Sequence, residues 1–91
     1  MNVIKRDGSK QAFDFGKVKY VLGKAFNSVD QDVPDKFLEQ LEDAFNKIKK
    51  DEIDVEEIQD IIQNELIKRN KYDVVESFII YRNKRAEILK K

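Results

Sequence analysis

Apolar side chains recur every three or four residues in four separate stretches of this 91-residue chain. That spacing places them on one face of a helix, so it predicts four amphipathic helices and limits the fold more than any other feature. Amphipathic helices joined by short loops bury their apolar faces against antiparallel neighbours, as in a four-helix bundle. The four stripes consist of Phe15, Val18, Leu22, Ala25, Phe26 and Val29; Phe37, Leu41, Ala44, Phe45 and Ile48; Val55, Ile58, Ile61, Ile62 and Leu66; and Val74, Val75, Phe78, Ile79 and Leu89.

Residues typical of helix beginnings precede these stripes. Asp14 stands at the N-cap position of the first helix, which we expect to run to about Asn27. Pro34 suits the first turn of the second helix, where its missing N–H group breaks no hydrogen bond. Asp54 and Asp73 each precede a glutamate by three residues. This is the spacing of a capping box, so the two aspartates mark the beginnings of the third and fourth helices.

A β-hairpin is predicted for residues 2–13, ahead of the first helix. Asp7-Gly8 lies between two short strand-like runs, and this dipeptide favours a tight turn because both residues tolerate a positive φ. A lone hairpin is only marginally stable, so we expect it to pack on one open end of the bundle. The predicted fold is therefore mainly α (α+β): a four-helix bundle capped by an N-terminal β-hairpin, in one domain of residues 1–91.

The composition excludes several kinds of chemistry. The chain has no cysteine and no histidine, which removes disulfides, nucleophiles of the Ser-His-Asp or Cys-His type, and the usual zinc ligands. Its acidic residues form no recognisable acid–base pair, so we expect no enzyme activity from this chain alone. No apolar run approaches the roughly 18 residues that a membrane span needs. With no signal-peptide pattern either, a cytoplasmic location is expected.

The 18 basic and 18 acidic residues cancel in number but are unevenly distributed. Residues 1–27 carry a net charge of +4, residues 28–66 carry −9, and residues 67–91 carry +5. If the basic ends meet in the fold, they form a positive site; alternatively, they are ordinary solvated helix faces. The overall balance argues against direct binding of nucleic acid, which favours a basic domain.

Lys5, Arg6 and Lys17 are candidates for a phosphate site. Lys5 and Arg6 adjoin the hairpin turn, and Lys17 lies in the first turn of the first helix, where free N–H groups favour anions. Arginine binds phosphate through two parallel hydrogen bonds, and lysine acts as a point charge. Tyr81 and Arg85, one turn apart on the last helix, are candidates for stacking on a base and binding phosphate. The alternative for each is a solvated, core or bundle-stabilising role, which spacing alone favours.

Several short segments, taken together, carry a resemblance to a known family. They are Val3-Ile4-Lys5-Arg6-Asp7-Gly8, Phe13-Asp14 with Lys17-Val18, Val55-Glu56-Glu57-Ile58-Gln59 within residues 53–62, and Tyr81-Arg82 with Arg85. In order and spacing they resemble the ATP-cone, the regulatory domain found at the N-terminus of many ribonucleotide reductases. The resemblance covers nearly the whole chain, and it is the combination of segments that makes it specific.

The resemblance implies a four-helix bundle capped by a small β-structure. It further implies that ATP or dATP binds between the cap and the helices, with Mg²⁺ held only through the phosphates of the nucleotide. In ribonucleotide reductases, ATP at this domain maintains activity and dATP stops it, through a changed oligomeric state or changed substrate and radical handling. The expected partners are thus adenine nucleotides, the catalytic domain of a reductase and, where a homo-oligomer forms, further copies of the chain.

The resemblance also implies roles for individual residues. Lys5, Arg6 and Lys17 match positions that contact the nucleotide, and we expect them on its phosphates. The remaining implied contacts are Val3 and Val18 near the base, Phe13 in the same segment, Gln11 and Asp14 on the base or ribose, Val55 and Gln59 on the third helix, and Tyr81 and Arg85 from the last helix.

Two positions depart from the family pattern. Val55 stands where some members have a hydroxyl residue, and its side chain cannot hydrogen-bond a phosphate. Gln59 stands where some members have a histidine, but its amide can still bind the ribose. The number of nucleotides bound therefore stays open, as does the preference between ATP and dATP.

Three functions remain open from the sequence. The first is the allosteric domain of a ribonucleotide reductase, with the anaerobic triphosphate class favoured because its cone often starts at the initiator Met. The second is the cone of a transcriptional repressor of reductase genes, a family that places a zinc ribbon before the cone. The third is a helical interaction module that binds no nucleotide and is not stabilised by ATP.

Overall fold

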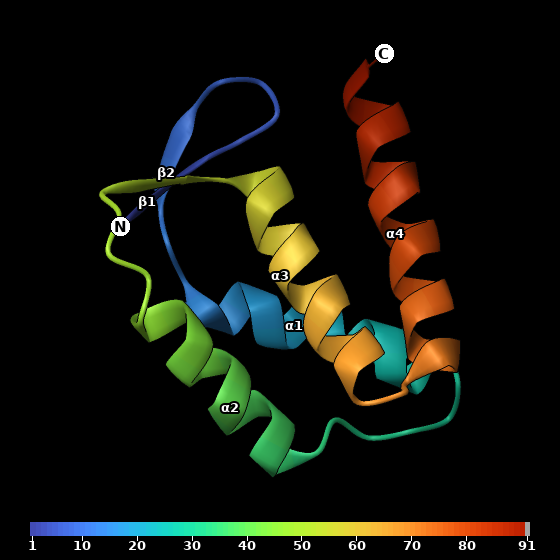
Figure 1. Ribbon diagram of the computed structural model, residues 1–91. Coiled ribbons are helices and arrows are strands. Elements are labelled where there is room, and N and C mark those ends of the chain that lie inside the picture. Colours follow the sequence, from blue (N-terminus) through green and yellow to red (C-terminus); the bar gives the residue numbers. More distant parts are fainter. Residues whose placement is uncertain (91) are drawn as a thin grey trace.

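The helices and strands follow the predicted order, with one strand added. The computed structural model describes the backbone of residues 1–90 and the side chains of residues 1–84. Over these residues the fold is mainly α with a small β cap, which confirms the predicted fold class (Figure 1). The elements are β1 (Asn2–Ile4), β2 (Lys10–Ala12), α1 (Phe15–Asn27), α2 (Asp35–Asn46), β3 (Glu52–Asp54), α3 (Val55–Lys68) and α4 (Tyr72–Lys90).

Aspartate side chains fix the beginnings of two helices. The Oδ1 atom of Asp14 accepts a hydrogen bond from the backbone N–H of Gly16 at 2.8 Å, and Oδ1 of Asp54 accepts one from Glu56 at 2.8 Å. Each bond satisfies one of the N–H groups that a helix leaves free in its first turn. Pro34 is the N-cap of α2, one position before the first turn expected for it. The first helix begins and ends where the sequence predicts.

The capping boxes predicted for the third and fourth helices are wrong in detail. The carboxylate of Glu57 accepts a hydrogen bond from Nζ of Lys50 at 2.8 Å instead of returning to Asp54. Asp73 lies inside α4, which begins one residue earlier, and its Oδ1 accepts the N–H of Val74 at 2.8 Å. Both acids still place negative charge in the first turn, where the helix dipole favours it.

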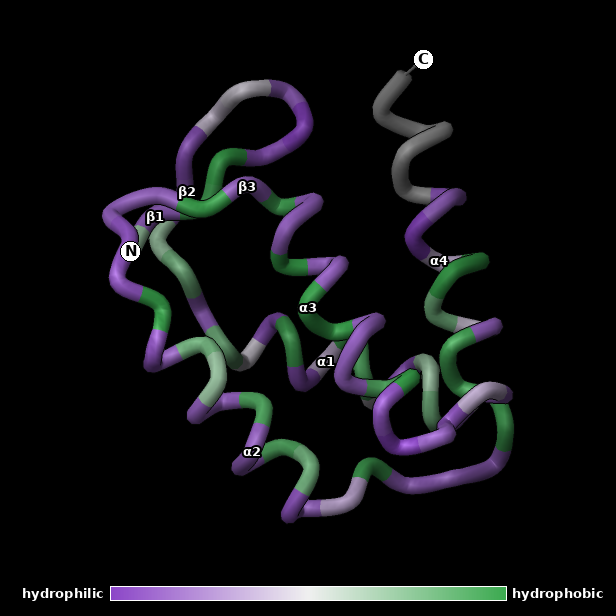
Figure 2. The backbone as a smooth tube through the Cα atoms, in the orientation of Figure 1, coloured by the Kyte–Doolittle hydropathy of each residue, from purple (hydrophilic) through white to green (hydrophobic). Residues whose placement is uncertain are grey.

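The four apolar stripes meet in one core. Their central residues are buried, and stripe ends such as Phe15, Val29 and Ile48 pack partly buried against them. In Figure 2, hydrophobic stretches alternate with hydrophilic ones along α1, α2 and α3, as this arrangement requires. Leu89, assigned to the fourth stripe, lies outside the described side chains. The buried residues are Val18, Leu22, Ala25, Phe26, Phe37, Leu41, Phe45, Ile53, Ile58, Ile62, Leu66, Val74, Val75 and Phe78.

The predicted hairpin is part of a three-stranded sheet. β1 is the central strand: β2 pairs with one edge of β1 in antiparallel orientation, and β3 pairs with the other edge of β1 in parallel orientation. In the parallel ladder Asn2 lies opposite Glu52, and Val3 lies opposite Ile53. The N–H of Asn2 also donates to the carbonyl of Asp51 at 2.8 Å. A parallel pair needs a long crossover between its strands, and here α1 and α2 form it.

The hairpin loop is longer than the tight Asp7-Gly8 turn that was predicted. The N–H of Gly8 donates to the carbonyl of Lys5 at 2.9 Å, and the N–H of Lys5 donates to the carbonyl of Ser9 at 2.8 Å. Gly8 has a φ of 86°, while Oδ1 of Asp7 accepts hydrogen bonds from both the N–H and the hydroxyl of Ser9. This is the three-residue loop in which a left-handed residue follows a type I turn. Only Gly8 needs the positive φ.

The β cap, formed by β1, β2 and β3, lies at the end of the molecule where α3 begins. In Figure 1, α3 and α4 run side by side in opposite directions, and α1 crosses behind them. α4 packs against both α1 and α3. None of the helices in the described residues has the length and apolar content that a membrane crossing requires. The arrangement leaves the β cap above the beginnings of α1 and α3, where the candidate site lies.

Candidate functional site

A cleft with a volume of about 210 Å³ lies between the β cap and the N-terminal halves of α1 and α3. Nine of the twelve predicted site residues line it, so the structure brings three distant segments of the sequence to one place. The lining residues are Val3, Lys5, Gln11, Ala12, Phe13, Asp14, Lys17, Val18, Val21, Val55, Ile58, Gln59 and Ile62.

The walls of the cleft are mostly apolar. Val3 of β1, Val18 of α1 and Val55 of α3 come from three elements and line the same space. Phe13, between β2 and α1, packs its ring on that of Phe45 with 5.1 Å between the centroids, which ties this wall to the core. An apolar space with a few polar groups is typical of a site for a small molecule.

Lys5 and Lys17 bring positive charge to the cleft. Both side chains are exposed, and neither has an ion-pair partner among the described side chains. Lys17 belongs to the first turn of α1, beside backbone N–H groups that favour anions. Asp14, which caps this turn, is the one acidic residue in the lining. The cleft therefore has a net positive charge.

Gln59 supplies a side-chain amide to the wall formed by α3. Its Oε1 atom is buried and has no hydrogen-bond partner among the described residues. An unpaired buried polar atom costs roughly 1–3 kcal/mol, and most such atoms in proteins find a partner. Gln59 is therefore a group that a polar ligand in the cleft can satisfy.

Arg6 does not line the cleft, although Lys5 beside it does. The Nε atom of Arg6 donates to Oε1 of Glu56 at 2.6 Å, and only 14% of the arginine side chain is exposed. Its Nη2 atom is buried and unpaired among the described residues. The two consecutive cations therefore lie in different surroundings.

Glu56 connects Arg6 to Arg82 of α4. Its Oε2 atom accepts a hydrogen bond from Nη2 of Arg82 at 2.8 Å, and Nη1 of Arg82 lies 2.9 Å from Asp60. The hydrogen bond from Arg82, aided by Arg6, holds the pKa of Glu56 below its ordinary value. Burial alone lowers the pKa of Arg82, but its bonds to Glu56 and Asp60 raise it overall. Glu56 and Arg82 therefore stay charged near neutral pH.

Tyr81 lines a hollow next to the cleft. This hollow, with a volume of about 440 Å³, shares Asp14, Lys17 and Val21 with the cleft. Tyr81 and Arg6 are thus the two predicted site residues that the structure places outside the cleft itself. Arg85, the remaining one, lies outside the described side chains.

Four lining residues and one charged cluster were not predicted from the sequence. Helical spacing places Val21 one turn after Val18, and Ile58 and Ile62 on the face of Val55, so the pattern contained the signal for three of the four lining residues. The fourth, Ala12, gave no signal of its own. For the cluster, nothing in the sequence distinguishes Glu56 and Asp60 from other acids near the beginning of a helix, where the helix dipole favours them. Arg82 was noted in the closing segment without a role.

Comparison with known proteins identifies the relatives of this chain. A family model described as the ATP cone domain matches residues 1–87. The alpha subunit of ribonucleoside-diphosphate reductase from Chlamydia pneumoniae is 33% identical over an alignment of 95 positions, which covers 92% of this chain and 9% of that protein. The subunit of the same name from Treponema pallidum (strain Nichols) is 29% identical over an alignment of 96 positions, which covers 96% of this chain and 11% of that protein.

The chain spans about a tenth of the length of these curated relatives. Both are named as diphosphate reductases, so they support the reductase relationship but not the anaerobic triphosphate class that the sequence analysis favoured. The match of the family model extends over every element that lines the cleft. The chain therefore belongs to the ATP-cone family.

Proposed function

We propose that this chain is an allosteric domain that senses ATP and dATP and sets the overall activity of a ribonucleotide reductase. The observation that carries this proposal is the cleft between the β cap and the helices. Its walls are mostly apolar. Lys5 and Lys17 have no ion-pair partner among the described side chains. The buried Oε1 atom of Gln59 has no hydrogen-bond partner among the described residues. These three features suit the base, the phosphates and the ribose of a nucleotide.

The proposed pose puts the base against the apolar walls and the phosphates toward α1. Phosphates near Lys5 and Lys17 meet two point charges and the positive end of the α1 helix dipole. The adjoining hollow, which shares Lys17 with the cleft, extends the space available beyond 210 Å³. The base and ribose then contact Val3, Gln11, Phe13, Asp14, Val18, Val55 and Gln59, and Arg6, Tyr81 and Arg85 complete the proposed site.

Mg²⁺ enters this proposal only with the nucleotide. Among the described residues, no group of three or more acidic side chains lies in a position to hold a metal ion. Nucleotide phosphates bind Mg²⁺ directly, and the ion usually keeps several of its waters. We assign no reaction to this chain, because its proposed role is to bind an effector.

The ribose provides the means to distinguish the two effectors. If the Gln59 amide hydrogen-bonds the 2′-hydroxyl of ATP, dATP leaves it unpaired, at a cost of about 1–3 kcal/mol. A ligand shifts a conformational equilibrium only by its differential affinity for the two states. A difference of this size is within the usual range of allosteric coupling, about 1–3 kcal/mol.

The output of the switch is proposed from the relatives. Because they are reductase alpha subunits, we place the catalytic domain of a reductase next to this chain, in the cytoplasm. Nucleotide exchange then changes the oligomeric state of the reductase or its handling of substrate and radical.

The proposal is tested by calorimetric titration of the chain with ATP, dATP and GTP in Mg²⁺ buffer. We expect saturable binding of both adenine nucleotides and weak binding of GTP. Lys17→Ala lowers the affinity about tenfold or more, because it removes a charge-assisted contact. Lys19→Ala is the matched control: Lys19 is exposed on the same helix and lines neither the cleft nor the hollow. Its loss leaves the affinity nearly unchanged.

A second outcome favours the interaction module instead. If the folded chain binds none of the three nucleotides and its melting temperature does not respond to ATP, the sensing function is refuted. Equal losses of affinity in the Lys17 and Lys19 variants would indicate a diffuse charge effect and would remove the phosphates from the proposed position.

A further inference from the structure

Arg6 is nearly enclosed, with 14% of its side chain exposed, and unlike Lys5 it does not line the cleft. The loop between β1 and β2 leans over the beginning of α3 toward α4 (Figure 1), and Arg6 reaches the first turn of α3 from it. Its guanidinium makes one hydrogen bond with a carboxylate, from Nε to Glu56, while Nη2 stays buried and unpaired among the described residues. A guanidinium has five N–H donors, so this arginine is only partly satisfied.

Glu56 divides its two oxygens between two arginines. Oε1 binds Arg6 at 2.6 Å, and Oε2 binds Arg82 at 2.8 Å. One carboxylate thus ties the loop of the β cap to α4. The two arginines depend on it unequally, because Arg82 also contacts Asp60 at 2.9 Å and Gln63 at 3.2 Å. Arg6 has Glu56 as its sole ion-pair partner among the described side chains.

A polyphosphate and a carboxylate compete for the same guanidinium. A triphosphate offers more charge and more acceptor oxygens than one carboxylate, and it pairs with arginine through two parallel hydrogen bonds. Lys5, the neighbour of Arg6 in the chain, already lines the cleft. An exchange of one partner of Arg6 for the other requires a rearrangement of the loop of residues 5–9. Glu56 is 47% exposed, so its hold on Arg6 is weakened by solvent.

We propose that Glu56 is a positioning residue that holds Arg6 away from the cleft in competition with the nucleotide phosphates. The proposal rests on the nucleotide-sensing function proposed above and adds a residue that sets its sensitivity. When nucleotide binds, Arg6 exchanges Glu56 for a phosphate, and Arg82 keeps Asp60. The tie between the loop of the β cap and α4 is then broken, so occupancy of the cleft is transmitted to the last helix.

The test compares the ATP affinities of the unmodified chain and Glu56→Gln. The amide keeps the shape of the side chain but loses its charge, so it releases Arg6, and ATP binds about fivefold more tightly. In an Arg6→Ala background the same substitution brings no gain. Glu56→Asp keeps the charge but is one methylene shorter, so it also weakens the hold on Arg6 and makes ATP bind more tightly.

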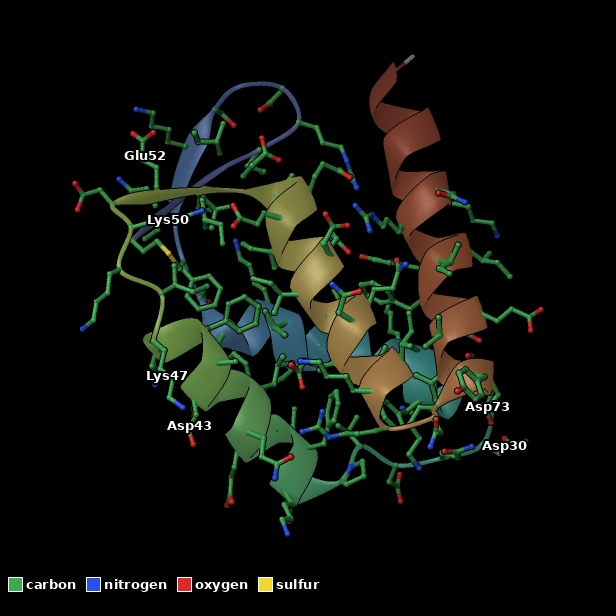
Figure 3. The ribbon with its side chains drawn as sticks, viewed as in Figure 1. Asp30, Asp43, Lys47, Lys50, Glu52 and Asp73 are labelled. Carbon is green, nitrogen blue, oxygen red and sulfur yellow. The ribbon has the colours of Figure 1, made fainter. Side chains whose placement is uncertain are left out.

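Glu57→Gln is the matched control. Glu57 is in the same first turn of α3, but its carboxylate pairs with Lys50, which lies by the β cap on the side away from α4 (Figure 3). It therefore removes an equal charge near the cleft without touching Arg6. The ATP affinity of Glu57→Gln stays within about twofold of the unmodified chain, the size of a screened surface charge effect.

A spectroscopic measurement follows the arginine directly. In ¹⁵N spectra of the unmodified chain, the Nε–H signal of Arg6 moves when ATP or inorganic tripolyphosphate is added, and that of Arg82 moves less. Without any added ligand, the Arg6 signal of Glu56→Gln already has a different chemical shift from that of the unmodified chain. A purely structural role for Glu56 predicts no dependence of the signal on the phosphate ligand.

The outcomes separate the two proposals. If the unmodified chain binds ATP and Glu56→Gln binds it no more tightly than Glu57→Gln does, the competition by Glu56 is refuted and the sensing function stands. If none of the folded chains binds ATP, both are refuted. A gain in affinity that persists in the Arg6→Ala background also overturns the inference, because Glu56 then acts on the ligand without Arg6.

Discussion

Val3 of β1 and Ile53 of β3 lie opposite each other in a parallel ladder, although all of α1 and α2 separates them in the chain. Ile53 is 2% exposed and belongs to the core, while Val3 packs against the core and lines the cleft. The pair therefore joins the β cap to the helices at the site.

Ile53→Ala is expected to lower the free energy of unfolding by about 3 kcal/mol, because it leaves a cavity beneath the sheet. Urea denaturation measures the change. Ile67→Ala is the control for the same chemical change: Ile67 is 41% exposed on α3. Its substitution costs less than about 0.5 kcal/mol, since alanine also favours the helix. Similar losses in the two variants would mean that Ile53 does not anchor the sheet.

Gly8→Ala and Gly23→Ala are expected to change stability in opposite directions. Gly8 has a φ of 86°, so a side chain there is strained even though nothing lies within 4 Å of an added Cβ. The cost is about 1 kcal/mol. Gly23 lies within α1 with the same open space, so alanine there stabilises by about 0.5–1 kcal/mol. Melting temperatures of both variants measure this, and a stabilised Gly8→Ala would contradict the loop geometry.

Asp14 has a capping role that is separable from its charge. Asp14→Ala removes the acceptor for the N–H of Gly16 and is expected to cost about 1 kcal/mol of stability. Asp14→Asn keeps an acceptor oxygen and costs little, since asparagine caps helices as well as aspartate does. Urea denaturation distinguishes the two. Equal destabilisation by both substitutions would show that the negative charge, and not the cap, stabilises α1.

The contribution of Glu56 to stability is expected to depend on pH. The bond from Arg82, then that from Arg6, lowers its folded-state pKa below the ordinary 4.5. A lowered pKa gives stability that is present above the unfolded-state value and is lost as pH falls through the folded-state value. The difference in unfolding free energy between the unmodified chain and Glu56→Gln is therefore constant from pH 7 to about pH 5 and shrinks below it. Solvent screening keeps it under about 1 kcal/mol.

Urea denaturation at a series of pH values from 7 to 3 tests this expectation. Acid still destabilises Glu56→Gln, because the hydrogen bond from Arg69 also lowers the pKa of Glu65. A difference between the two chains that grows on acidification would refute the assigned pairing of Glu56.

Gln59→Leu is expected to separate stability from binding. It replaces a buried oxygen that lacks a partner among the described residues with an apolar group, so the free chain stays as stable or gains up to about 1 kcal/mol. ATP affinity falls about tenfold, because the cleft loses its amide. Denaturation and calorimetric titration of the same variant measure both quantities. A marked loss of stability would show that the amide has a structural partner instead.

The helices were predictable because their signals are local. Each stripe repeats at the helical period, and residues such as Asp14 and Asp54 mark helix beginnings within a few positions. β3 was not predictable in this way. Its three residues, Glu52 to Asp54, hold one apolar side chain, and their strand geometry comes from pairing with β1 across the chain. Strand preference depends on such context more than helix preference does.

The candidate site was predictable in its membership more than in its contacts. The positions of Val3, Lys17 and Gln59 followed from the family resemblance, and the fold brings all three to one cleft. The sequence did not predict that Arg6 binds Glu56 and does not line the cleft, because neighbouring loop residues can face opposite sides. Its carboxylate partner Glu56 has the same spacing as any acid in a first turn.

The parallel pairing of β1 with β3 has a consequence for the order of events during synthesis. β1 leaves the ribosome before β2 and α1, but the strand that completes the sheet appears only after α2. Pairing over so long a separation closes a large loop, which slows it relative to local helix formation. Most of α3, with Gln59, emerges after β3. A nascent chain that has made only the hairpin and two helices therefore has the sides of the cleft formed by the hairpin and α1, and the remaining side arrives with α3.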